Sequence, residues 1–281
     1  MYHIKKRVKA SLSLMWWPLG KIFRYVPQIC YAEIPILYYH SIGDTPNASG
    51  FRVQVDDFEE QIKYLVSNYE VISFDELLTR YEKRDVKLLR NTALVTFDDG
   101  YLDNFEEMYP IVKKYNCSTM IYICTGFINK DVDFFEDGEK LRPMSWDQIS
   151  EMYSSGLIEF GLHTDTHRRQ HHLTRKESLD DIKKSKDILV ERLGVEIYHY
   201  APPNGDYNYD TFDILQELNV KTSVTTEIST FQSRNLLKLS RIMVSSDDNI
   251  SIFKKRLNGY FNYLKIFHRL KRYIRDGIKR P

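Results

Sequence analysis

Two adjacent carboxylates at the end of an apolar run are the residues of this chain best suited to chemistry. The run is β-branched and leads directly into Asp98, Asp99 and Gly100, as a buried strand does when it carries acidic groups to the edge of a sheet. Because side chains alternate along a strand, Asp98 and Asp99 cannot share one environment unless the backbone turns, which Gly100 permits. One carboxylate could then hold a metal ion while the other handles protons. The alternative is a solvated Asp-Asp-Gly turn.

Two histidines follow a second predicted strand at 158–162. His163 and His167 are the ends of the sequence His-Thr-Asp-Thr-His. Imidazoles with this spacing meet on one face of a helical turn, so we expect them to converge on one ion. With Asp99 they would form a set of two histidines and one carboxylate that leaves positions open for water and substrate. The alternative is a pair of polar surface residues in a histidine-rich loop.

A third segment combines a short aromatic strand with a restricted turn. The sequence Ala201-Pro-Pro-Asn-Gly places Asn204 and Gly205 in a turn whose geometry the two prolines limit. A rigid turn of this kind can aim a backbone N–H at a developing oxyanion. The segment could equally be an ordinary turn before the next helix.

Together these segments resemble the polysaccharide deacetylases, which are carbohydrate esterase family 4 with its NodB-homology domain. The resemblance runs from about residue 34 to residue 244. It is carried by the segments Pro35–His40, Thr96–Gly100, Met144–Gln148, His163–His167, Pro203–Gly205 and Leu239–Ile242. The opening Tyr-His and the form of the third motif most resemble the branch that deacetylates bacterial exopolysaccharides rich in N-acetylglucosamine.

The resemblance implies a role for each motif residue. Asp98 would be the general base, and Asp99, His163 and His167 would be the metal ligands. The expected enzyme is a metal-dependent hydrolase that cleaves the amide of N-acetyl groups on an amino-sugar-containing glycan and releases acetate. The metal would polarise the acetamide carbonyl and lower the pKa of a bound water, and a backbone N–H near Asn204 would stabilise the oxyanion. We expect one divalent ion, zinc first, with iron, cobalt, manganese or nickel as alternatives.

Departures in two of the family's motifs affect the assignment of catalytic roles. Ala201 stands where the family usually has an arginine that orients the base, and Asn204 replaces the usual aromatic residue. The late Leu-x-His that supplies the general acid in many members is also absent. His40, at the end of its own predicted strand, is the best substitute for the acid; alternatively it only packs beside the site. These losses motivate a second hypothesis, a catalytically silent carbohydrate-binding barrel.

The 281 residues, of which 42% are hydrophobic, can bury one sizeable core. Strand-like and helical segments alternate, which predicts an α/β fold with a largely parallel sheet. The expected strands are 34–39, 92–97, 118–124, 158–162, 197–200, 222–225 and 237–244; the expected helices are 56–68, 74–81, 102–115, 146–155, 176–193 and 209–218. The resemblance implies a distorted (β/α) barrel with fewer than eight strands, with the site at the carboxyl ends of the strands. The polar segment 129–143 is expected to be a loop over the rim of the site.

Charge divides the chain into a domain at 31–250, an N-terminal extension at 1–30 and a basic amphipathic helix at 251–281. Residues 1–30 hold six basic and no acidic residues, and residues 254–281 hold ten basic and one acidic. The totals of 40 and 39 then leave 24 basic and 38 acidic residues at 31–253, a formal net charge of −14. Apolar residues recur in the tail at spacings of three and four: Phe253, Leu257, Tyr260, Leu264, Phe267, Leu270, Ile274 and Ile278.

The tail pattern is typical of a helix that lies on an anionic membrane surface. The alternative is that its apolar face packs on the barrel. The apolar run at 10–20, with Trp16 and Trp17, could add an interfacial anchor but is too short to span a bilayer.

No convincing secretory signal is present, so we expect a bacterial peripheral membrane protein on the cytoplasmic face. An uncleaved N-terminal anchor with an exported domain is the alternative. The partner would be an N-acetylated glycan or glycan intermediate. The acidic body and the lack of a recognition motif argue against nucleic acid.

Overall fold

The computed structural model describes residues 32–44, 50–83, 91–130, 134–136, 139–232 and 234–262. The N-terminal extension at 1–30, with its tryptophans, and the tail beyond residue 262 lie outside this part of the chain. Their predicted membrane contacts therefore stay predictions.

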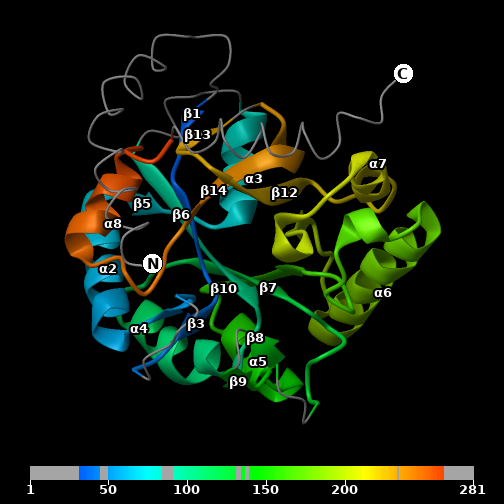
Figure 1. The fold of residues 1–281 in the computed structure, drawn as a ribbon, viewed down its shortest axis with the longest axis horizontal. Helices are drawn as coiled ribbons and strands as arrows, with labels where there is room; N and C mark the ends of the chain where they lie inside the picture. Colours follow the sequence, from blue (N-terminus) through cyan, green and yellow to red (C-terminus); the bar gives the residue numbers. More distant parts are fainter. Residues whose placement is uncertain are drawn as a thin grey trace, which may run out of the picture.

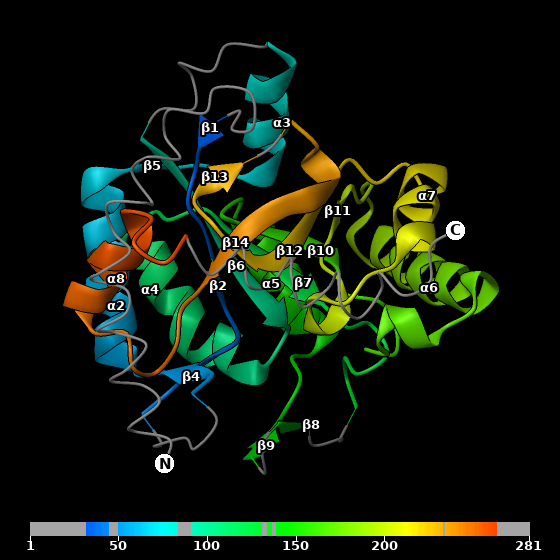
Figure 2. The ribbon, with the colours of Figure 1, turned by 45° about the horizontal axis from the view of Figure 1, so that its top comes forward.

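Within the described residues, seven parallel strands close into a barrel (Figures 1 and 2). Their order around the barrel is β2, β14, β12, β11, β10, β7 and β6, and β6 pairs with β2 to close the ring. The strands are β2 (Ile36–Tyr39), β6 (Thr92–Asp99), β7 (Thr119–Ile123), β10 (Ile158–Leu162), β11 (His199–Tyr200), β12 (Thr222–Ile228) and β14 (Leu239–Met243). A short strand, β5 (Glu70–Val71), pairs in parallel with the first two residues of β6, Thr92 and Ala93. The predicted distorted barrel with fewer than eight strands is confirmed.

The central strand β6 explains why the sequence pattern was informative. All eight of its residues are buried, which is why apolar and β-branched residues fill the strand up to Phe97 without polar alternation. The predicted end at Phe97 is wrong by two residues, because β6 continues through Asp98 and Asp99 in register with Tyr122 and Ile123 of β7. Both carboxylates therefore belong to the strand itself.

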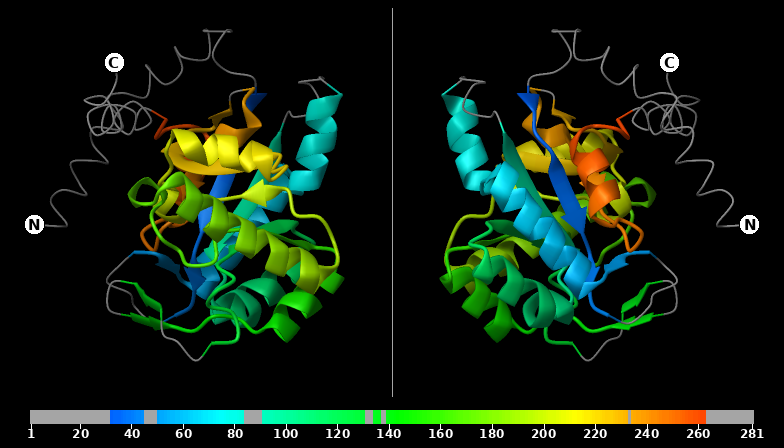
Figure 3. Two further views of the ribbon diagram at one scale, coloured as in Figure 1. Left: turned by 90° about the vertical axis from the view of Figure 1, so that its right-hand side faces the viewer. Right: turned by 90° about the vertical axis from the view of Figure 1, so that its left-hand side faces the viewer.

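Helices surround the barrel, as the views in Figure 3 show. They are α2 (Val55–Asn68), α3 (Phe74–Glu82), α4 (Tyr109–Lys114), α5 (Trp146–Ser154), α6 (Arg175–Leu193), α7 (Tyr209–Glu217) and α8 (Ile250–Leu257), with a π-helical turn at Asn104–Met108 before α4. Capping boxes fix several starts: Ser145 and Gln148 cap each other's backbone at α5, and Thr174 and Glu177 do so at α6. These caps set where each helix begins after its strand.

In the described part of the chain, three small two-stranded sheets lie outside the barrel. They are β1 (Ala32–Glu33) with β13 (Phe231–Gln232), β3 (Ser41–Ile42) with β4 (Arg52–Val53), and β8 (Phe134–Glu136) with β9 (Glu139–Leu141). The last pair corrects the expectation of a plain loop at 129–143. The base of this hairpin is fixed to the turn after β6, since Leu102 N donates to Arg142 O at 2.7 Å and Met144 N to Gly100 O at 3.1 Å.

The start of the predicted tail helix packs on the barrel. In α8, Phe253 and Leu257 are buried in the core, and the ring of Phe253 meets that of Tyr64 on α2 at 6.5 Å. For these two residues the alternative is correct, because their side chains pack on the barrel. No helix among the described residues is both long and apolar enough to cross a membrane.

Candidate active site

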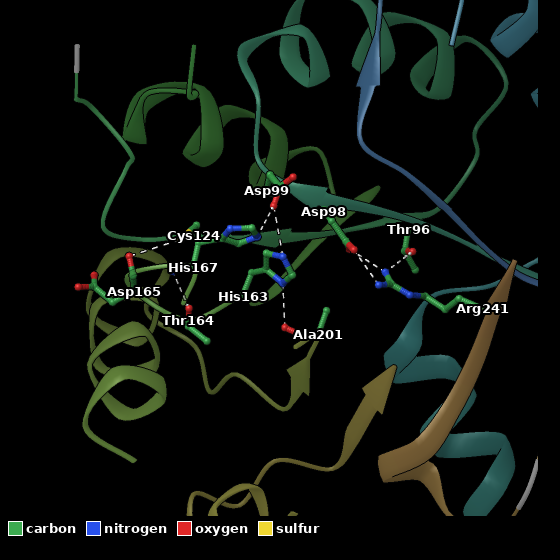
Figure 4. Close-up of polar contacts among 10 residues, drawn as sticks. All are labelled: Thr96, Asp98, Asp99, Cys124, His163, Thr164, Asp165, His167, Ala201 and Arg241. Atoms are coloured by element: carbon green, nitrogen blue, oxygen red, sulfur yellow. Dashed lines mark hydrogen bonds and ion pairs between the residues drawn. The ribbon is translucent and has the colours of Figure 1, made fainter. Parts of the chain in front are cut away.

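The two neighbouring aspartates at the end of β6 face different partners. Both are buried, and the backbone adopts left-handed φ values of 77° at Asp99 and 80° at Gly100. A side chain at Gly100 would place its Cβ 2.8 Å from Ile123 Cγ2, so the turn needs glycine. Figure 4 shows Asp99 directed at two imidazoles and Asp98 directed at Arg241. The expected division of the pair into two environments is present.

The three predicted ligand side chains converge. Asp99 Oδ1 lies 3.2 Å from His163 Nε2 and 3.2 Å from His167 Nε2. The ligand atoms of all three residues lie within 4.8 Å of one another. This is the two-histidine, one-carboxylate set that the sequence predicted.

The backbone that brings the histidines together is a loop, so the predicted helical turn is wrong. Thr164 and His167 have left-handed φ values of 65° and 56°, and none of residues 163–169 is helical. The loop is held by His167 N, which donates to Thr164 Oγ1 at 3.0 Å, and by Thr125 N, which donates to Thr164 O at 3.3 Å. Such conformations cost on the order of 1–3 kcal/mol each and persist where the surroundings fix them.

The chemistry of this donor set fits a divalent cation. The carbonyl of Ala201 lies 2.8 Å from His163 Nδ1; since a carbonyl only accepts, Nδ1 carries the proton. A neutral His163, the form that binds metals, then turns the Nε2 lone pair toward Asp99 Oδ1. That oxygen is buried and has no hydrogen-bond partner among the described residues. A cation between these acceptors would satisfy all of them.

Asp98 is held by a buried arginine. Arg241 Nη1 and Nη2 donate to Asp98 Oδ1 and Oδ2, each at 2.7 Å, and Arg241 is fully buried on β14. The guanidinium also donates to Thr96 Oγ1 at 3.2 Å and Thr225 O at 3.3 Å, and it lies 4.3 Å from the ring centroid of Tyr38. Burial raises the pKa of Asp98, but the charge and hydrogen bonds of Arg241, together with the charges of His163 and His40, outweigh it and the pKa is lowered.

Arg241 is the functional residue that sequence reasoning missed. The position where the family usually has its base-orienting arginine holds Ala201, whose carbonyl binds His163 instead. Arg241 supplies a guanidinium to Asp98 from a different strand. The available signal was a charged residue inside the buried run of β14, whose other residues are apolar except Ser240.

His40 lies at the same end of the barrel, directly after β2. Its backbone carbonyl accepts from Asn104 Nδ2 at 2.9 Å, and its ring packs against Phe51 with a centroid distance of 4.9 Å. His40 Nδ1 is buried without a hydrogen-bond partner among the described residues. After burial, Arg241 and His163, the charge of His40 also contributes to the pKa of Asp98, so the imidazole is within electrostatic range of that carboxylate.

A half-buried acid, Asp103, is linked to the backbone of His40 through Asn104. Asp103 accepts from the hydroxyl of Ser41 and from Asn104 Nδ2, the latter at 2.9 Å. Burial raises the pKa of Asp103 to about 6 against the smaller lowering effects of Ser41 and Arg52. Asp103 therefore titrates close to the pH range in which a histidine would act.

The predicted oxyanion turn is tied to the ligands only through Ala201. Asn204 and Gly205 lie in a 3₁₀ turn with left-handed φ values of 56° and 62°. A Cβ at Gly205 would lie 2.1 Å from Thr226 Oγ1, which requires glycine there. In the described part of the chain, neither residue hydrogen-bonds to the aspartates or histidines of the site; Asn204 Oδ1 accepts from Arg169 Nη2 at 3.5 Å.

Comparisons with known proteins agree with this geometry. The polysaccharide deacetylase family model matches residues 85–223. YxkH of Bacillus subtilis strain 168, named provisionally as a polysaccharide deacetylase, is 30% identical over 227 residues, covering 79% of this chain and 75% of that protein. The poly-β-1,6-N-acetyl-D-glucosamine N-deacetylase of Staphylococcus aureus strain MRSA252 is 26% identical over 236 residues, covering 79% of this chain and 78% of that protein.

Solved structures show the same fold. The Streptococcus pyogenes deacetylase PplD, in complex with acetate, matches with a TM-score of 0.70 at 27% identity, covering 80% of this chain and 97% of that one. IcaB from Ammonifex degensii matches with a TM-score of 0.69 at 22% identity, over 80% of this chain and 97% of that one. By sequence and by fold, this chain belongs to the polysaccharide deacetylase family.

Proposed function

We propose that this deacetylase is metal-dependent and removes the N-acetyl groups of N-acetylglucosamine units in a glycan, releasing acetate and leaving a free amine. Family membership supplies the deacetylation. The observation that carries metal dependence is the position of Asp99 Oδ1, 3.2 Å from each of two imidazole nitrogens, in a site where Ala201 fixes the proton of His163 on the opposite nitrogen.

Asp99, His163 and His167 would hold one divalent ion, with Zn²⁺ as the first choice for a set of two nitrogens and one oxygen. When bound, the ion supplies Lewis acidity toward the acetamide carbonyl and lowers the pKa of water. The Ala201 carbonyl acts on the ligand set from outside it. Its bond to His163 Nδ1 fixes the ring and raises the basicity of Nε2, as hydrogen bonds to metal-binding histidines generally do.

Asp98 would act as the general base. Its ion pair with Arg241 keeps the carboxylate charged at neutral pH, and an acceptor in this state can take the proton of an attacking water. Because the guanidinium contacts both carboxylate oxygens, it also fixes the orientation of the side chain. Arg241 is in this account a positioning residue.

His40 would act as the general acid toward the leaving amine, and a backbone N–H of the turn at Asn204 and Gly205 would stabilise the oxyanion. The placement of His40 after β2 and its electrostatic effect on Asp98 support the first assignment. The left-handed backbone at Asn204 and Gly205 supports the second, since strained turns of this kind concentrate at functional sites.

The substrate class rests on the relatives. The S. aureus relative is named for poly-β-1,6-N-acetyl-D-glucosamine, so a β-1,6-linked N-acetylglucosamine polymer is the first substrate to test. A catalytically silent carbohydrate-binding barrel is the competing hypothesis. Its first motivation, the missing arginine, is weakened because Arg241 contacts the base.

The experiment measures acetate release from β-1,6-linked N-acetylglucosamine oligomers, with chitin oligomers, peptidoglycan fragments and lipid-linked sugars in parallel. Activity should fall on chelation and return with Zn²⁺. The variant Asp98→Asn serves as a matched control that keeps the ligands but lacks the base. Oligomer binding by the zinc-loaded protein without acetate release from any of these substrates would favour the silent barrel. Release that is unaffected by chelation would refute metal dependence alone.

A further inference from the structure

A second set of metal-ligating side chains lies away from the deacetylase site. Asp75, Glu159 and His199 each offer a ligand atom, and these atoms lie within 4.8 Å of one another. The three residues come from three elements: Asp75 is the second residue of α3, Glu159 the second of β10 and His199 the first of β11. No step of deacetylation uses them.

The set lies at the opposite end of the barrel from the active site. Glu159 lies on β10 and His163 directly follows that strand, four residues later, which separates the two by about 13 Å at 3.3 Å per residue. Glu159 and His199 are therefore at the amino ends of their strands, whereas the catalytic groups follow the carboxyl ends. An ion held here would be separate from the catalytic one.

Two of the three side chains are oriented by contacts to other parts of the fold, and His199 in turn contacts Asp75. Glu159 accepts from the backbone N–H groups of Phe74 at 2.7 Å and Asp75 at 3.1 Å. His199 Nδ1 lies 2.8 Å from Thr222 Oγ1, which directs Nε2 toward Asp75 Oδ1 at 3.2 Å. Supporting contacts of this kind hold ligands in place around a metal.

Burial and exposure in the set are arranged so that an ion could enter from solvent. His199 and Glu159 are largely covered, with the imidazole side chain only 5% exposed, while the Asp75 side chain is 71% exposed. Asp75 therefore forms the open side of the cluster, as an entry path requires.

The formal charge of the set also favours a cation. Two carboxylates face one imidazole, so a divalent ion would balance both carboxylates and use the neutral imidazole as a ligand.

We propose that Asp75, Glu159 and His199 bind one divalent transition-metal cation, which fastens α3 to the amino ends of β10 and β11. One imidazole and two carboxylates suit Zn²⁺, Co²⁺ or Mn²⁺, and three protein ligands are too few for Ca²⁺. The amino-terminal face of such barrels generally serves stability. The ion is therefore structural.

The test counts zinc ions per chain by titration calorimetry and elemental analysis, on the full chain stripped of metal. Wild type should bind two Zn²⁺, and Asp75→Ala and His163→Ala one each. The double variant should bind none. Asp147→Ala is the matched control, because Asp147 is also an exposed second residue of a helix that follows a serine cap and an aromatic residue; it should bind two.

Zinc should also raise the melting temperature of His163→Ala but not of the double variant. Asp75→Ala should deacetylate like wild type, since Asp75 is remote from the catalytic groups, and its exposed position keeps the fold intact. Two zinc ions in Asp75→Ala, or a single one in wild type that Asp75→Ala keeps, would overturn the proposal. If the catalytic site instead bound no metal, wild type and His163→Ala would each bind one ion and Asp75→Ala none, so the two failures are distinguishable.

Discussion

Replacing Arg241 by methionine should damage both stability and catalysis, for one shared reason. Arg241 is the charge that compensates buried Asp98, through two hydrogen bonds of 2.7 Å. Methionine keeps most of the volume but leaves Asp98 without its buried partner. Breaking such a pair from one side costs about 3–5 kcal/mol, so we expect a loss of this size in the free energy of unfolding at pH 7.

The catalytic consequence is a changed pH profile. In the wild type the pKa of Asp98 is lowered because Arg241, with His163 and His40, outweighs burial. In the variant the contribution of Arg241 is lost, so burial shifts the balance toward the protonated acid, which cannot accept a proton. A loss of about 3 kcal/mol in stabilisation of the charged form moves the acidic limb of kcat/KM upward by about two pH units. Because the wild-type pKa of Asp98 lies below the usual 3.8, the shifted limb lies below about pH 6, so activity should fall most at mildly acidic pH and recover toward neutral pH.

A double variant separates the unpaired charge from lost packing. Arg241→Met combined with Asp98→Asn removes both charges, so it should be more stable than Arg241→Met alone while remaining inactive at every pH. Denaturant unfolding and acetate release across pH measure both quantities. The reasoning would be refuted by an Arg241→Met enzyme with the wild-type pH profile, or by a double variant no more stable than the single one.

Four further predictions follow from the site and the chain ends. His163→Ala should lose the catalytic ion and nearly all acetate release, and unchanged activity in this variant would contradict the ligand assignment. Asp98→Asn should keep the metal, by elemental analysis, and lose a factor on the order of 10² or more in kcat. The pKa of Asp103 is raised to about 6 from 3.8, so the native state keeps this proton to a higher pH than the unfolded chain does. The free energy of unfolding should therefore fall as the pH rises from about 4 to 6, by at most about 3 kcal/mol from this group, and Asp103→Asn should remove that dependence when unfolding by urea is measured across pH. We propose that residues 263–281 bind anionic membrane, so a chain ending at Asn262 should no longer bind anionic liposomes. Salt should weaken binding of the intact chain, because it screens an attraction worth roughly 1 kcal/mol per basic residue.

The metal set could be predicted from the sequence because its members lie at the carboxyl ends of strands or directly after them. Parallel strands of a barrel present their carboxyl ends at one rim, so motifs that follow β6 and β10 meet there wherever they stand in the chain. The same logic predicted the position of His40 after β2. These inferences needed only strand ends, which apolar runs mark well.

Arg241 could not be assigned in the same way, because its role depends on the order of the strands around the barrel and on the direction in which its side chain points. It pairs with Asp98 across 143 residues of chain, and β14 and β6 are not adjacent strands, since β2 lies between them. Only the closed ring directs both side chains into the same interior. A buried arginine in the sequence signals a partner but does not name it.

Local backbone geometry was the other weak point of the sequence reasoning. The spacing of His163 and His167 suggested a helical turn, whereas the loop uses left-handed residues at Thr164 and His167. Non-glycine residues in this region carry little sequence signal. The hairpin of β8 and β9 was missed for a related reason, because two strands of three residues each in a polar segment resemble a loop.

The way the β8–β9 hairpin is joined to the barrel has an evolutionary consequence. Asn129 N donates to Met144 O at 3.3 Å and Asn129 Oδ1 accepts from Trp146 N at 2.7 Å, so hydrogen bonds join the two ends of the segment between residues 130 and 143. Exchanging this segment for one of another length changes loop-closure entropy only slightly and leaves these hydrogen bonds, and with them the turn at Gly100, in place. Selection can therefore replace the hairpin as a module that is inherited separately from the residues of the candidate active site.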